Sequence, residues 1–244
     1  MAARRFFIEN THGAGERVVV ANADAHKIRD VLRLRAGDTI EIVDSSGQIF
    51  DALLADVDGG VTVELRALID ARDAEPSLQI DVAQGIPKGQ KMDFVVEKLS
   101  ELGVASILPL ASERAVVRDP GDGKVERWRR LAKTAAQQSG RRSILTVNEP
   151  IGFEDLLGRF GGYDVVLFPW EVASGDHNLR AELPAIVERA RRVLVVVGPE
   201  GGFSHAEAGR ARDAGARVIS LGRRILRTET AALVLVAILQ YLSE

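Results

Sequence analysis

Residues 193–204 read Val193-Leu-Val-Val-Val-Gly198-Pro199-Glu200-Gly201-Gly202-Phe203-Ser204, an apolar run that leads into a glycine-rich segment. A continuous apolar run is typical of a parallel strand that is covered on both faces of its sheet. Ser204 stands three residues before Glu207, which is the spacing of a capping box and predicts that a helix begins there. A strand, a glycine turn and a helix in this order predict an α/β domain.

The glycine segment, Gly198 to Gly202, is open to two interpretations. Glycines at the carboxyl end of a strand let the backbone approach a ligand closely, and this is where α/β sheets usually bind ligands. The same residues also suit an ordinary tight turn. A dinucleotide site is not indicated, because the G-x-G-x-x-G pattern is missing and no phosphate-binding lysine follows.

A second segment of this kind is Leu221-Gly222-Arg223-Arg224-Ile225-Leu226-Arg227-Thr228-Glu229-Thr230-Ala231. It follows a predicted strand and leads into a predicted helix, with Thr228 as the candidate N-cap. Its charged side chains are costly to bury unless Arg227 pairs with Glu229 or Glu200, or unless they face a ligand. A third strand ends in Leu167-Phe168-Pro169-Trp170-Glu171. Together the three strand ends predict one pocket.

Outward from these segments, residues 76–244 alternate between strand and helix patterns. The predicted strands are Leu78–Gln84, Ser106–Pro109, Val165–Phe168, Val193–Val197 and Val218–Leu221. The predicted helices are Gln90–Leu102, Val125–Ser139, Ser204–Ala214 and Thr228–Leu242. This alternation predicts a mostly parallel sheet.

The N-terminal part of the chain reads instead as short strands separated by turn residues. The predicted strands, which suggest a small β-barrel, are Arg5–Ile8, Arg17–Ala21, Thr39–Val43, Ile49–Leu54 and Val61–Leu65. One helix is predicted over Ala25–Leu34, with Ile28, Val31 and Leu32 on one face. Residues 70–77 are polar and contain a proline, so we place a boundary there, between domains of residues 1–72 and 76–244.

The composition limits the class of protein. The 244 residues contain no cysteine, which excludes disulfides, thiolate metal sites and a cysteine nucleophile. The longest apolar run, Ala231–Leu239, is about half the length needed to cross a bilayer, so we expect a soluble, cytoplasmic protein. The net charge is −3, but basic residues gather at residues 26–35, 124–142 and 223–227. These groups indicate either solvated helix faces or an anionic partner.

Taken in order, these residues resemble the ribosomal RNA small subunit methyltransferase E family, whose members are 16S rRNA uridine-N3 methyltransferases of the knotted SPOUT class. The segments 198–202 and 221–231 carry the resemblance, and weaker matches extend it over nearly the whole chain. Those matches are Arg4-Arg5-Phe6-Phe7, His26 with Val31-Leu32-Arg33 and Gly37-Asp38, Lys88 with Lys91-Met92, Lys98 with Glu101-Leu102-Gly103-Val104, Pro109 with Ser112-Glu113-Arg114, and Trp128 with Gln138-Ser139-Gly140-Arg141. The chain departs from the family's usual pattern at Gln137, Arg142 and Leu145.

The resemblance implies a PUA-like N-terminal β-barrel, a C-terminal SPOUT α/β domain with a deep trefoil knot, and a homodimer. It also implies S-adenosyl-L-methionine as cofactor. The implied cofactor-binding residues are Phe168, Pro169, Gly198, Pro199, Glu200, Gly201, Leu221, Gly222, Ile225 and Leu226. No metal is expected, because methyl transfer needs none and the four histidines lack ligand spacing.

The expected catalytic residues are Arg227, Glu229 and Arg224. Uridine N3 carries a proton and is a poor nucleophile until that proton is lost. The hypothesis is that Arg227, with Arg224, stabilises the negative charge that develops on oxygen. Glu229 or Glu200 then acts as the base or orients the arginine.

RNA contacts are implied for Arg4, Arg5, Arg33, Lys88, Arg114 and Arg141, and the implied partner is 16S rRNA within the 30S subunit. Two alternatives remain open: a related SPOUT methyltransferase with another RNA target, and a non-catalytic RNA-binding module that kept the fold. A generic nucleotide-binding enzyme is disfavoured, because the phosphate-loop signatures are missing.

Overall fold

The computed structural model describes residues 4–69, 76–172 and 179–243. The chain divides into two compact units, an N-terminal unit of Met1–Glu75 with Ala136–Ser143, and a C-terminal unit of Pro76–Ala135 with Ile144–Glu244. Most of the boundary predicted at residues 70–77 lies outside the described residues, and the division at 1–72 and 76–244 stays a prediction. The grouping of residues 136–143 with the N-terminal unit was not expected from the sequence.

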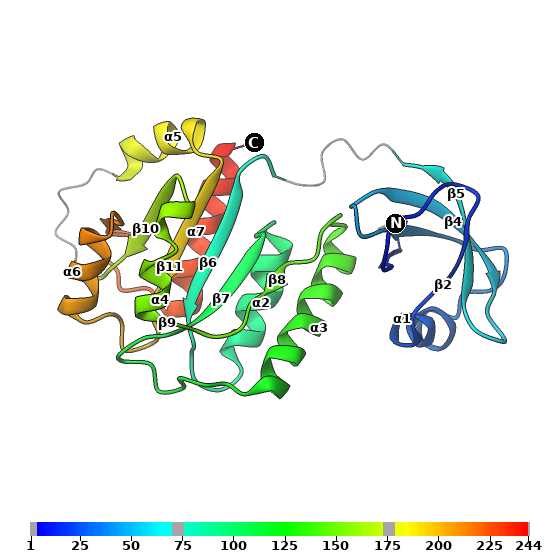
Figure 1. Cartoon of the computed structure of the whole chain (residues 1–244), viewed down its shortest axis with the longest axis horizontal. Helices are drawn as coiled ribbons and strands as arrows, with labels where there is room; N and C mark the ends of the chain where they lie inside the picture. The colour runs from blue at the N-terminus through cyan, green and yellow to red at the C-terminus, as the bar shows by residue number, and fades with distance from the viewer. Residues whose placement is uncertain (1–3, 70–75, 173–178, 244) are drawn as a thin grey trace. The chain divides into compact units, whose positions relative to one another are not determined.

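The N-terminal unit is built on a five-stranded sheet in the order β1-β3-β4-β5-β2, which forms a half-barrel (Figure 1). Its strands are β1 (Arg5–Phe7), β2 (Arg17–Val19), β3 (Thr39–Val43), β4 (Ile49–Asp56) and β5 (Thr62–Leu68). Along β4, Phe50, Ala52 and Leu54 are buried and alternate with more exposed residues, as expected for a strand with one face on a core. The five predicted strands are confirmed to within a few residues at each end.

The predicted helix of the N-terminal unit has an unexpected geometry. Helix α1 (Asn22–His26) runs into a π-helix, η1 (Lys27–Val31). Leu32 N–H donates to Lys27 O at 2.9 Å, an i→i+5 bond that widens the turn. Ile28 is buried but Val31 is 63% exposed, so the prediction that these two side chains share one face of the helix is wrong. The α-helical spacing that would bring the two side chains together does not hold in a π-turn.

The end of helix α3 (Asp122–Ser139) contributes a buried amide to the N-terminal unit. Gln137 Nε2 donates to Asp24 Oδ1 at 2.9 Å, and Gln137 Oε1 accepts from Lys27 Nζ at 2.8 Å. This is one of the positions where the chain departs from the resembled family. An amide satisfies both neighbours, since an ionised carboxylate here has no proton to donate to Asp24.

The C-terminal unit contains a parallel sheet in the order β12-β10-β11-β6-β7-β8, with β9 beside β7. Its strands are β6 (Gln79–Gly85), β7 (Ser106–Ala111), β8 (Thr146–Val147), β9 (Ile151–Gly152), β10 (Val165–Pro169), β11 (Arg192–Val197) and β12 (Arg217–Ile219). Every pairing found among the described strands of this sheet is parallel, which confirms the predicted α/β architecture. The short strands β8 and β9 were not predicted.

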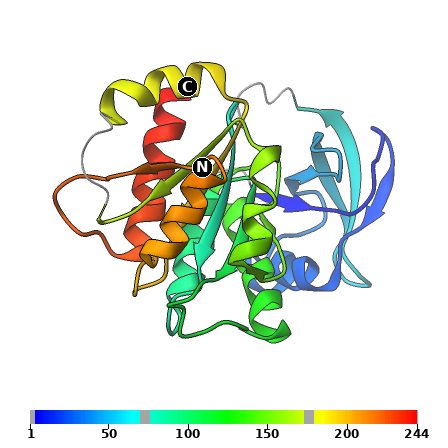
Figure 2. The same ribbon diagram turned by 60° about the vertical axis from the view of Figure 1, so that its left-hand side comes forward.

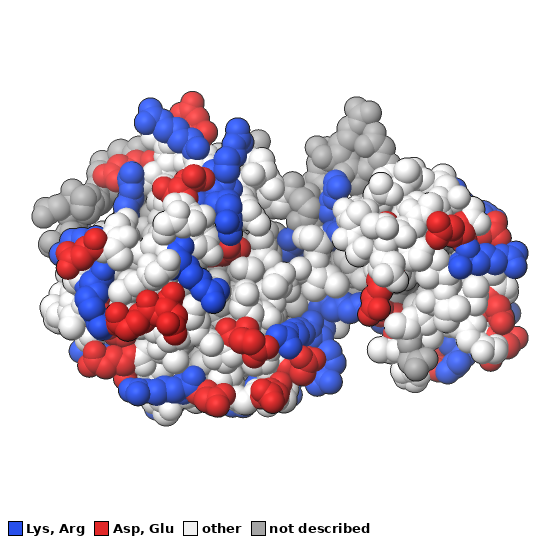
Figure 3. Space-filling model, viewed as in Figure 1, with Lys and Arg blue, Asp and Glu red and all other residues white. Residues whose placement is uncertain are grey.

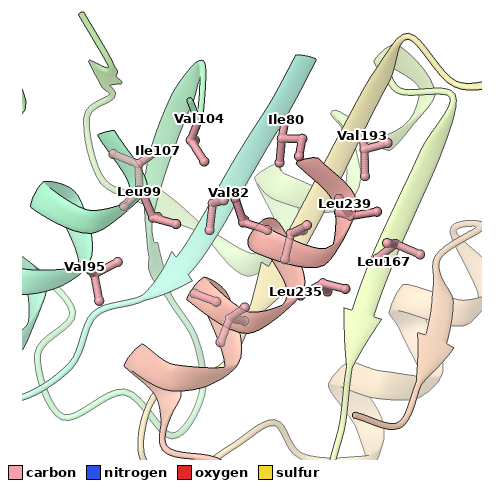
Figure 4. Packing of buried hydrophobic residues seen from close by; sticks show 14 of the residues in the cluster. Ile80, Val82, Val95, Leu99, Val104, Ile107, Leu167, Val193, Leu235 and Leu239 are labelled. Atoms are coloured by element: carbon pink, nitrogen blue, oxygen red, sulfur yellow. The ribbon is translucent and has the colours of Figure 1, made fainter. Parts of the chain in front are cut away.

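Helices cover both faces of this sheet (Figures 1 and 2). One face packs against α2 (Lys91–Glu101), α3, α5 (Leu179–Arg189) and α7 (Thr228–Ser243), and the other against α4 (Phe153–Leu157), the 3-10 turn η2 (Phe160–Gly162) and α6 (His205–Asp213). In β11, Val193, Val195 and Val197 join the first core, and Leu194 and Val196 join the second. Figure 4 shows the first core, where Leu235 and Leu239 of α7 lie over the sheet. The uninterrupted apolar run of β11 is thus explained, as predicted, by burial on both faces of the sheet.

The two helices that follow the loop segments begin differently. At α6, Glu207 N–H donates to Ser204 Oγ at 3.2 Å and Ser204 N–H donates to Glu207 Oε2 at 2.9 Å, which confirms the capping box. At α7, Thr228 is already the first helical residue, and its hydroxyl bonds to other segments of the chain. The prediction of Thr228 as N-cap is therefore wrong. Across the described residues, we find no helix with the length and apolar character needed to span a membrane.

Candidate active site

The three unusual strand ends meet at one cavity of about 540 Å³ in the C-terminal unit. Its walls come from the residues that follow β10, β11 and β12, together with the first turns of α2 and α7. The carboxyl ends of parallel strands share one edge of a sheet, which is why segments far apart in the sequence converge here. The predicted pocket is present.

Most of the predicted cofactor residues line this cavity: Pro169, Gly198, Pro199, Glu200, Gly201, Leu221, Gly222, Ile225 and Leu226. Phe168 does not. Its side chain is fully buried in the second core, and its ring centroid lies 4.3 Å from that of Phe203. Side chains alternate across a strand, so the residue before Pro169 points into the core rather than into the cavity.

Two glycines at the cavity, Gly85 and Gly202, occupy positions where a larger residue does not fit. A Cβ atom on Gly85 would lie 2.3 Å from Pro199 N and 2.6 Å from the Gly198 carbonyl carbon. Gly202 has φ +64°, and a Cβ there would also meet Glu171 Oε1 at 2.5 Å. Gly202 N–H closes a turn onto Pro199 O at 2.9 Å. The glycine segment is therefore a tight turn held against β6, and it also forms a cavity wall.

Of the predicted catalytic residues, Arg224 and Arg227 line the cavity and are exposed to it. No ion pair of Arg227 is found in the described part of the chain, so the interpretation that pairs it with Glu200 or Glu229 is not supported. Glu229, one residue into α7, is half-buried. Its Oε2 atom is buried and has no hydrogen-bond partner among the described residues.

Glu200 is paired with a lysine that the sequence analysis did not assign to the pocket. Lys91 Nζ donates to Glu200 Oε1 at 2.8 Å, and Lys88 N–H donates to the same oxygen at 3.1 Å. Burial acts to raise the pKa of Glu200, but the hydrogen bonds from Lys91 and from backbone N–H groups outweigh it, and the net pKa is lowered. The hydrogen bond to Glu200 raises the pKa of Lys91. The pair is therefore ionised at neutral pH.

Several residues that line the cavity were not assigned to the site from the sequence, among them Lys91, Trp170 and Thr228. Lys91 opens α2, and Trp170 Nε1 donates to Phe203 O at 3.3 Å below the glycine segment. The available signal was their position in the chain, because Trp170 directly follows β10 and Lys91 and Thr228 are the first residues of α2 and α7.

The segment after β7 is bonded to the glycine segment and to α6. Arg114 Nη1 donates to Gly201 O at 3.2 Å, and Ser204 Oγ donates to Glu113 Oε2 at 2.7 Å. Glu207, 1% exposed, also accepts from Glu113 N–H at 2.9 Å. Arg114 is thus exposed and bonded to Gly201, which lines the cavity.

The residues predicted to bind RNA divide into exposed and engaged side chains. Arg4, Arg33, Lys88 and Arg114 are exposed, and Arg114 also donates to Gly201 O. Arg5 pairs with Glu41 at 2.7 Å and donates to Gly140 O, and Arg141 is 4% exposed and donates to Ser143 Oγ at 2.8 Å. These bonds leave Arg5 and Arg141 little surface for RNA. On the face in Figure 3, basic and acidic side chains are interspersed over the C-terminal unit.

No group of three or more His, Asp or Glu side chains is arranged to hold a metal ion within residues 4–69, 76–172 and 179–243.

The model of an RNA methyltransferase domain family matches residues 74–240. The chain is 30% identical to the ribosomal RNA small subunit methyltransferase E of Bacillus subtilis, over 99% of this chain and 97% of that protein. It is 31% identical to the protein of the same name from Synechocystis, over 93% and 74%.

Solved structures of methyltransferases are also similar to this chain. The crystal structure of a ribosomal RNA small subunit methyltransferase E from Neisseria gonorrhoeae bound to S-adenosyl methionine is similar with a TM-score of 0.87, at 30% identity and 98% coverage of both chains. A methyltransferase from Legionella pneumophila in complex with SAM has a TM-score of 0.87, at 27% identity, covering 99% of this chain and 98% of that one. With the sheet and cavity described above, these matches define an RNA methyltransferase. The chain belongs to the ribosomal RNA small subunit methyltransferase E family.

Proposed function

We propose that the protein transfers a methyl group from S-adenosyl-L-methionine to N3 of a uridine in 16S ribosomal RNA, with the 30S subunit as substrate and the cytoplasm as its location. The observation that carries the proposal is the convergence of segments 198–202 and 221–227 on one cavity. The names of the relatives support the small-subunit rRNA target. The resemblance at the motifs supports N3 of uridine.

The residues present fit the cofactor. The cavity volume of about 540 Å³ lies within the usual range for small-molecule sites. Leu221, Ile225 and Leu226 offer an apolar surface for adenine, and Ile225 is 85% exposed in this structure, a high value for an aliphatic side chain. The glycine segment offers backbone groups within reach of a polar ligand. When bound, S-adenosylmethionine supplies an electrophilic methyl group.

The chain's own task is to make N3 nucleophilic. Arg227 and Arg224 extend into the cavity without competing ion pairs among the described residues, so their guanidinium groups are available to a developing oxyanion on the base. Such donors act most strongly where water is excluded. Arg227 is assigned this role, with Arg224 beside it.

Between the two candidate bases, the geometry favours Glu229 over Glu200. The Glu200 carboxylate accepts bonds from Lys91 and Lys88, and its lowered pKa makes it a weak base. Glu229 has an unpartnered buried oxygen, which a proton or an arginine of the loaded site would satisfy. Glu229 therefore accepts the N3 proton or orients Arg227, and Glu200 holds α2 to the glycine segment.

RNA is held by exposed basic residues, Arg4 and Arg33 on the N-terminal unit, and Lys88 and Arg114 on the C-terminal unit. Arg5 and Arg141 are left out of this set because their guanidinium groups are engaged within the protein. Phosphate contacts of this kind make binding weaken steeply as the salt concentration rises.

A homodimer is part of the proposal. Helix α7 buries Ala232, Leu235 and Leu239, yet it also exposes Val234, Ile238, Tyr241 and Leu242. These exposed positions follow the i, i+4, i+7, i+8 spacing of one helix face. An apolar face of this kind on a soluble protein supports burial against a second copy.

The proposal also includes a PUA-like N-terminal unit and a trefoil knot in the C-terminal unit. The five-stranded half-barrel with its own core is compatible with the first. For the second, the chain leaves the edge strand β12 and returns to the middle of the sheet, where α7 packs on β6 and β11. A return of this kind is what a knotted C-terminal helix requires.

Titration calorimetry with S-adenosylmethionine tests the enzyme against the non-catalytic alternative. We expect saturable binding with one site per chain, which is lost when Gly198 is replaced by a bulkier residue. A protein that binds 16S rRNA but no S-adenosylmethionine would be the binding module instead.

A further inference from the structure

Gln84, near the end of β6, is a fully buried polar residue that neither the motifs nor the proposed chemistry account for. Its side chain is 0% exposed. Its Nε2 donates to Gly85 O at 3.0 Å and to Thr228 Oγ1 at 2.7 Å. A buried amide is costly unless its bonds are made, so this one has a defined task.

The direction of the hydrogen bonds follows from the atoms involved. Thr228 Oγ1 lies 2.5 Å from Gly198 O, and a carbonyl oxygen only accepts, so the hydroxyl donates its single proton there. The hydroxyl oxygen must then accept from Gln84, which places the amide nitrogen and not the amide oxygen against Thr228. The result is a directed relay, from the Gln84 N–H through the Thr228 hydroxyl to the Gly198 carbonyl. Bonds in such a chain polarise and strengthen one another.

The relay joins three segments that meet at the cavity: the end of β6, the start of α7 and the end of β11. Gly198 and Thr228 line the cavity, whereas Gln84 does not. The Gly198–Pro199 peptide is also in contact with Gly85, where no Cβ atom fits. This peptide is therefore fixed on one side by the backbone of β6 and on the other by the relay.

We propose that Gln84 is a positioning residue for the cofactor site: through Thr228 it sets the orientation of the Gly198 peptide and so the path of the glycine segment. The inference rests on the proposed function, in which this cavity takes S-adenosylmethionine. The turn from Pro199 to Gly202 begins at the peptide that the relay holds. Removing the Gln84 donors releases one wall of the cavity while leaving every cavity-lining side chain in place.

Because the side-chain oxygen of Gln84 makes no hydrogen bond among the described residues, two substitutions can separate the role of its nitrogen. Gln84 Oε1 is buried and has no partner among the described residues, so both productive bonds come from the nitrogen. Gln84→Met keeps the approximate shape and removes both donors. Gln84→Glu removes the donors and adds acceptors, which compete with Gly198 O for the Thr228 proton. Both changes act on the glycine segment from a position outside the cavity.

The experiment is titration calorimetry of the full-length protein with S-adenosylmethionine and with S-adenosylhomocysteine. We expect Gln84→Met, Gln84→Glu and Thr228→Val to weaken binding of both by about tenfold, the effect of roughly one net hydrogen bond. Thr228→Ser keeps the hydroxyl and should restore affinity to near the wild-type value. Amide hydrogen exchange at residues 200–204 should rise in the Gln84 variants.

Ser100→Ala is the matched control. Ser100 is also 0% exposed, and its hydroxyl donates to Ala132 O at 3.2 Å, but it does not line the cavity. Its loss should lower the melting temperature and leave cofactor affinity unchanged.

Three outcomes overturn the inference. Wild-type affinity in both Gln84 variants would overturn it while the cofactor assignment stands. Equal weakening in Ser100→Ala would show that the effect is general destabilisation. If the wild-type protein binds neither compound, the cofactor assignment fails and this inference fails with it. Should the Gln84 variants not fold, the affinities of Thr228→Val and Thr228→Ser for S-adenosylmethionine are compared instead. Equal affinity in these two variants would overturn the inference.

Discussion

Lys91 Nζ lies 2.8 Å from Glu200 Oε1 and joins the first turn of α2 to the glycine segment that follows β11. Both side chains line the cavity, and both are about one-third exposed, at 38% and 31%. The pair therefore closes one side of the site and remains in contact with water. A partly solvated ion pair contributes little to stability, so its value lies in placing the two segments.

The first prediction concerns the pH range of this pair. Glu200 has a lowered pKa, so the stability that it contributes is present above its ordinary value of 4.5 and is lost as the pH falls through the lower folded-state value. Lys91→Met should lower the melting temperature by at most about 4 °C, equally at pH 8 and pH 6. Thermal denaturation over pH 3–8 measures this, with Glu200→Gln as the partner variant. If the difference in melting temperature between the wild type and Lys91→Met disappeared between pH 7 and pH 6, the lowered pKa of Glu200 would be contradicted.

The second prediction concerns Arg227. Arg227→Ala should lower kcat by about 100-fold or more, because a charge-stabilising donor is lost, while the S-adenosylmethionine affinity stays close to wild type. Arg227→Lys should recover only part of the rate, since an ammonium lacks the planar fork of donors. Methyl transfer to 30S subunits and calorimetry measure the two quantities. Normal turnover in Arg227→Ala would remove this residue from the mechanism.

The third prediction tests the close approach of β6 to the glycine segment. Gly85→Ala places a methyl group 2.3 Å from Pro199 N, so it should destabilise the protein by about 3 kcal/mol or more and abolish cofactor binding. Gly209→Ala is the control, because a Cβ there meets nothing within 4 Å and the residue lies inside α6. That change should stabilise the protein by up to about 1 kcal/mol. Chemical denaturation compares the two; equal stability would refute the tight contact.

The fourth prediction concerns the amino-terminal ends of the strands β10 and β6, opposite the cavity. Tyr163 donates to Asp81 Oδ2 at 2.9 Å, and burial, followed by the charge of Asp81, raises the pKa of Tyr163 to about 12. One of the two tyrosines should thus ionise only near pH 12 in an ultraviolet titration. Because the pKa of Tyr163 is raised in the folded state, the stability that its hydrogen bond to Asp81 contributes is complete below pH 10. This stability is lost as the pH rises towards 12.

Tyr163→Phe checks the same contact at neutral pH. The ring and its contact with Arg192 at 5.0 Å remain, but the buried Asp81, 4% exposed, loses a donor. The expected cost is about 1–3 kcal/mol, measured by denaturation at pH 7. An unchanged stability would mean that water replaces the hydroxyl.

The parts of the fold that depend on local pattern were predictable. The apolar run of β11 and the serine–glutamate spacing at α6 reflect burial and capping, which are local properties. Three strand ends with unusual residues were enough to predict a pocket, because parallel strands end at a common edge. Val31 was misplaced because a π-turn leaves no clear mark in the sequence.

The remaining site features depend on contacts between distant segments. The partners of Gln84 and Lys91 lie more than a hundred residues away, at Thr228 and Glu200. Arg141 illustrates the same dependence on distant contacts. Its charge suggested a contact with RNA, yet its guanidinium is buried within the protein. Residue type indicates what a side chain can bond to, and only tertiary structure shows which partner it has.

The most direct test of the proposed function is nucleoside mass spectrometry of 16S rRNA from a strain that lacks this protein. We expect 3-methyluridine to disappear from 16S rRNA and to return with the wild-type protein, but not with Arg227→Ala. This expectation would be contradicted if 3-methyluridine stayed at its normal level while a ribose-methylated nucleoside or another methylated base was lost.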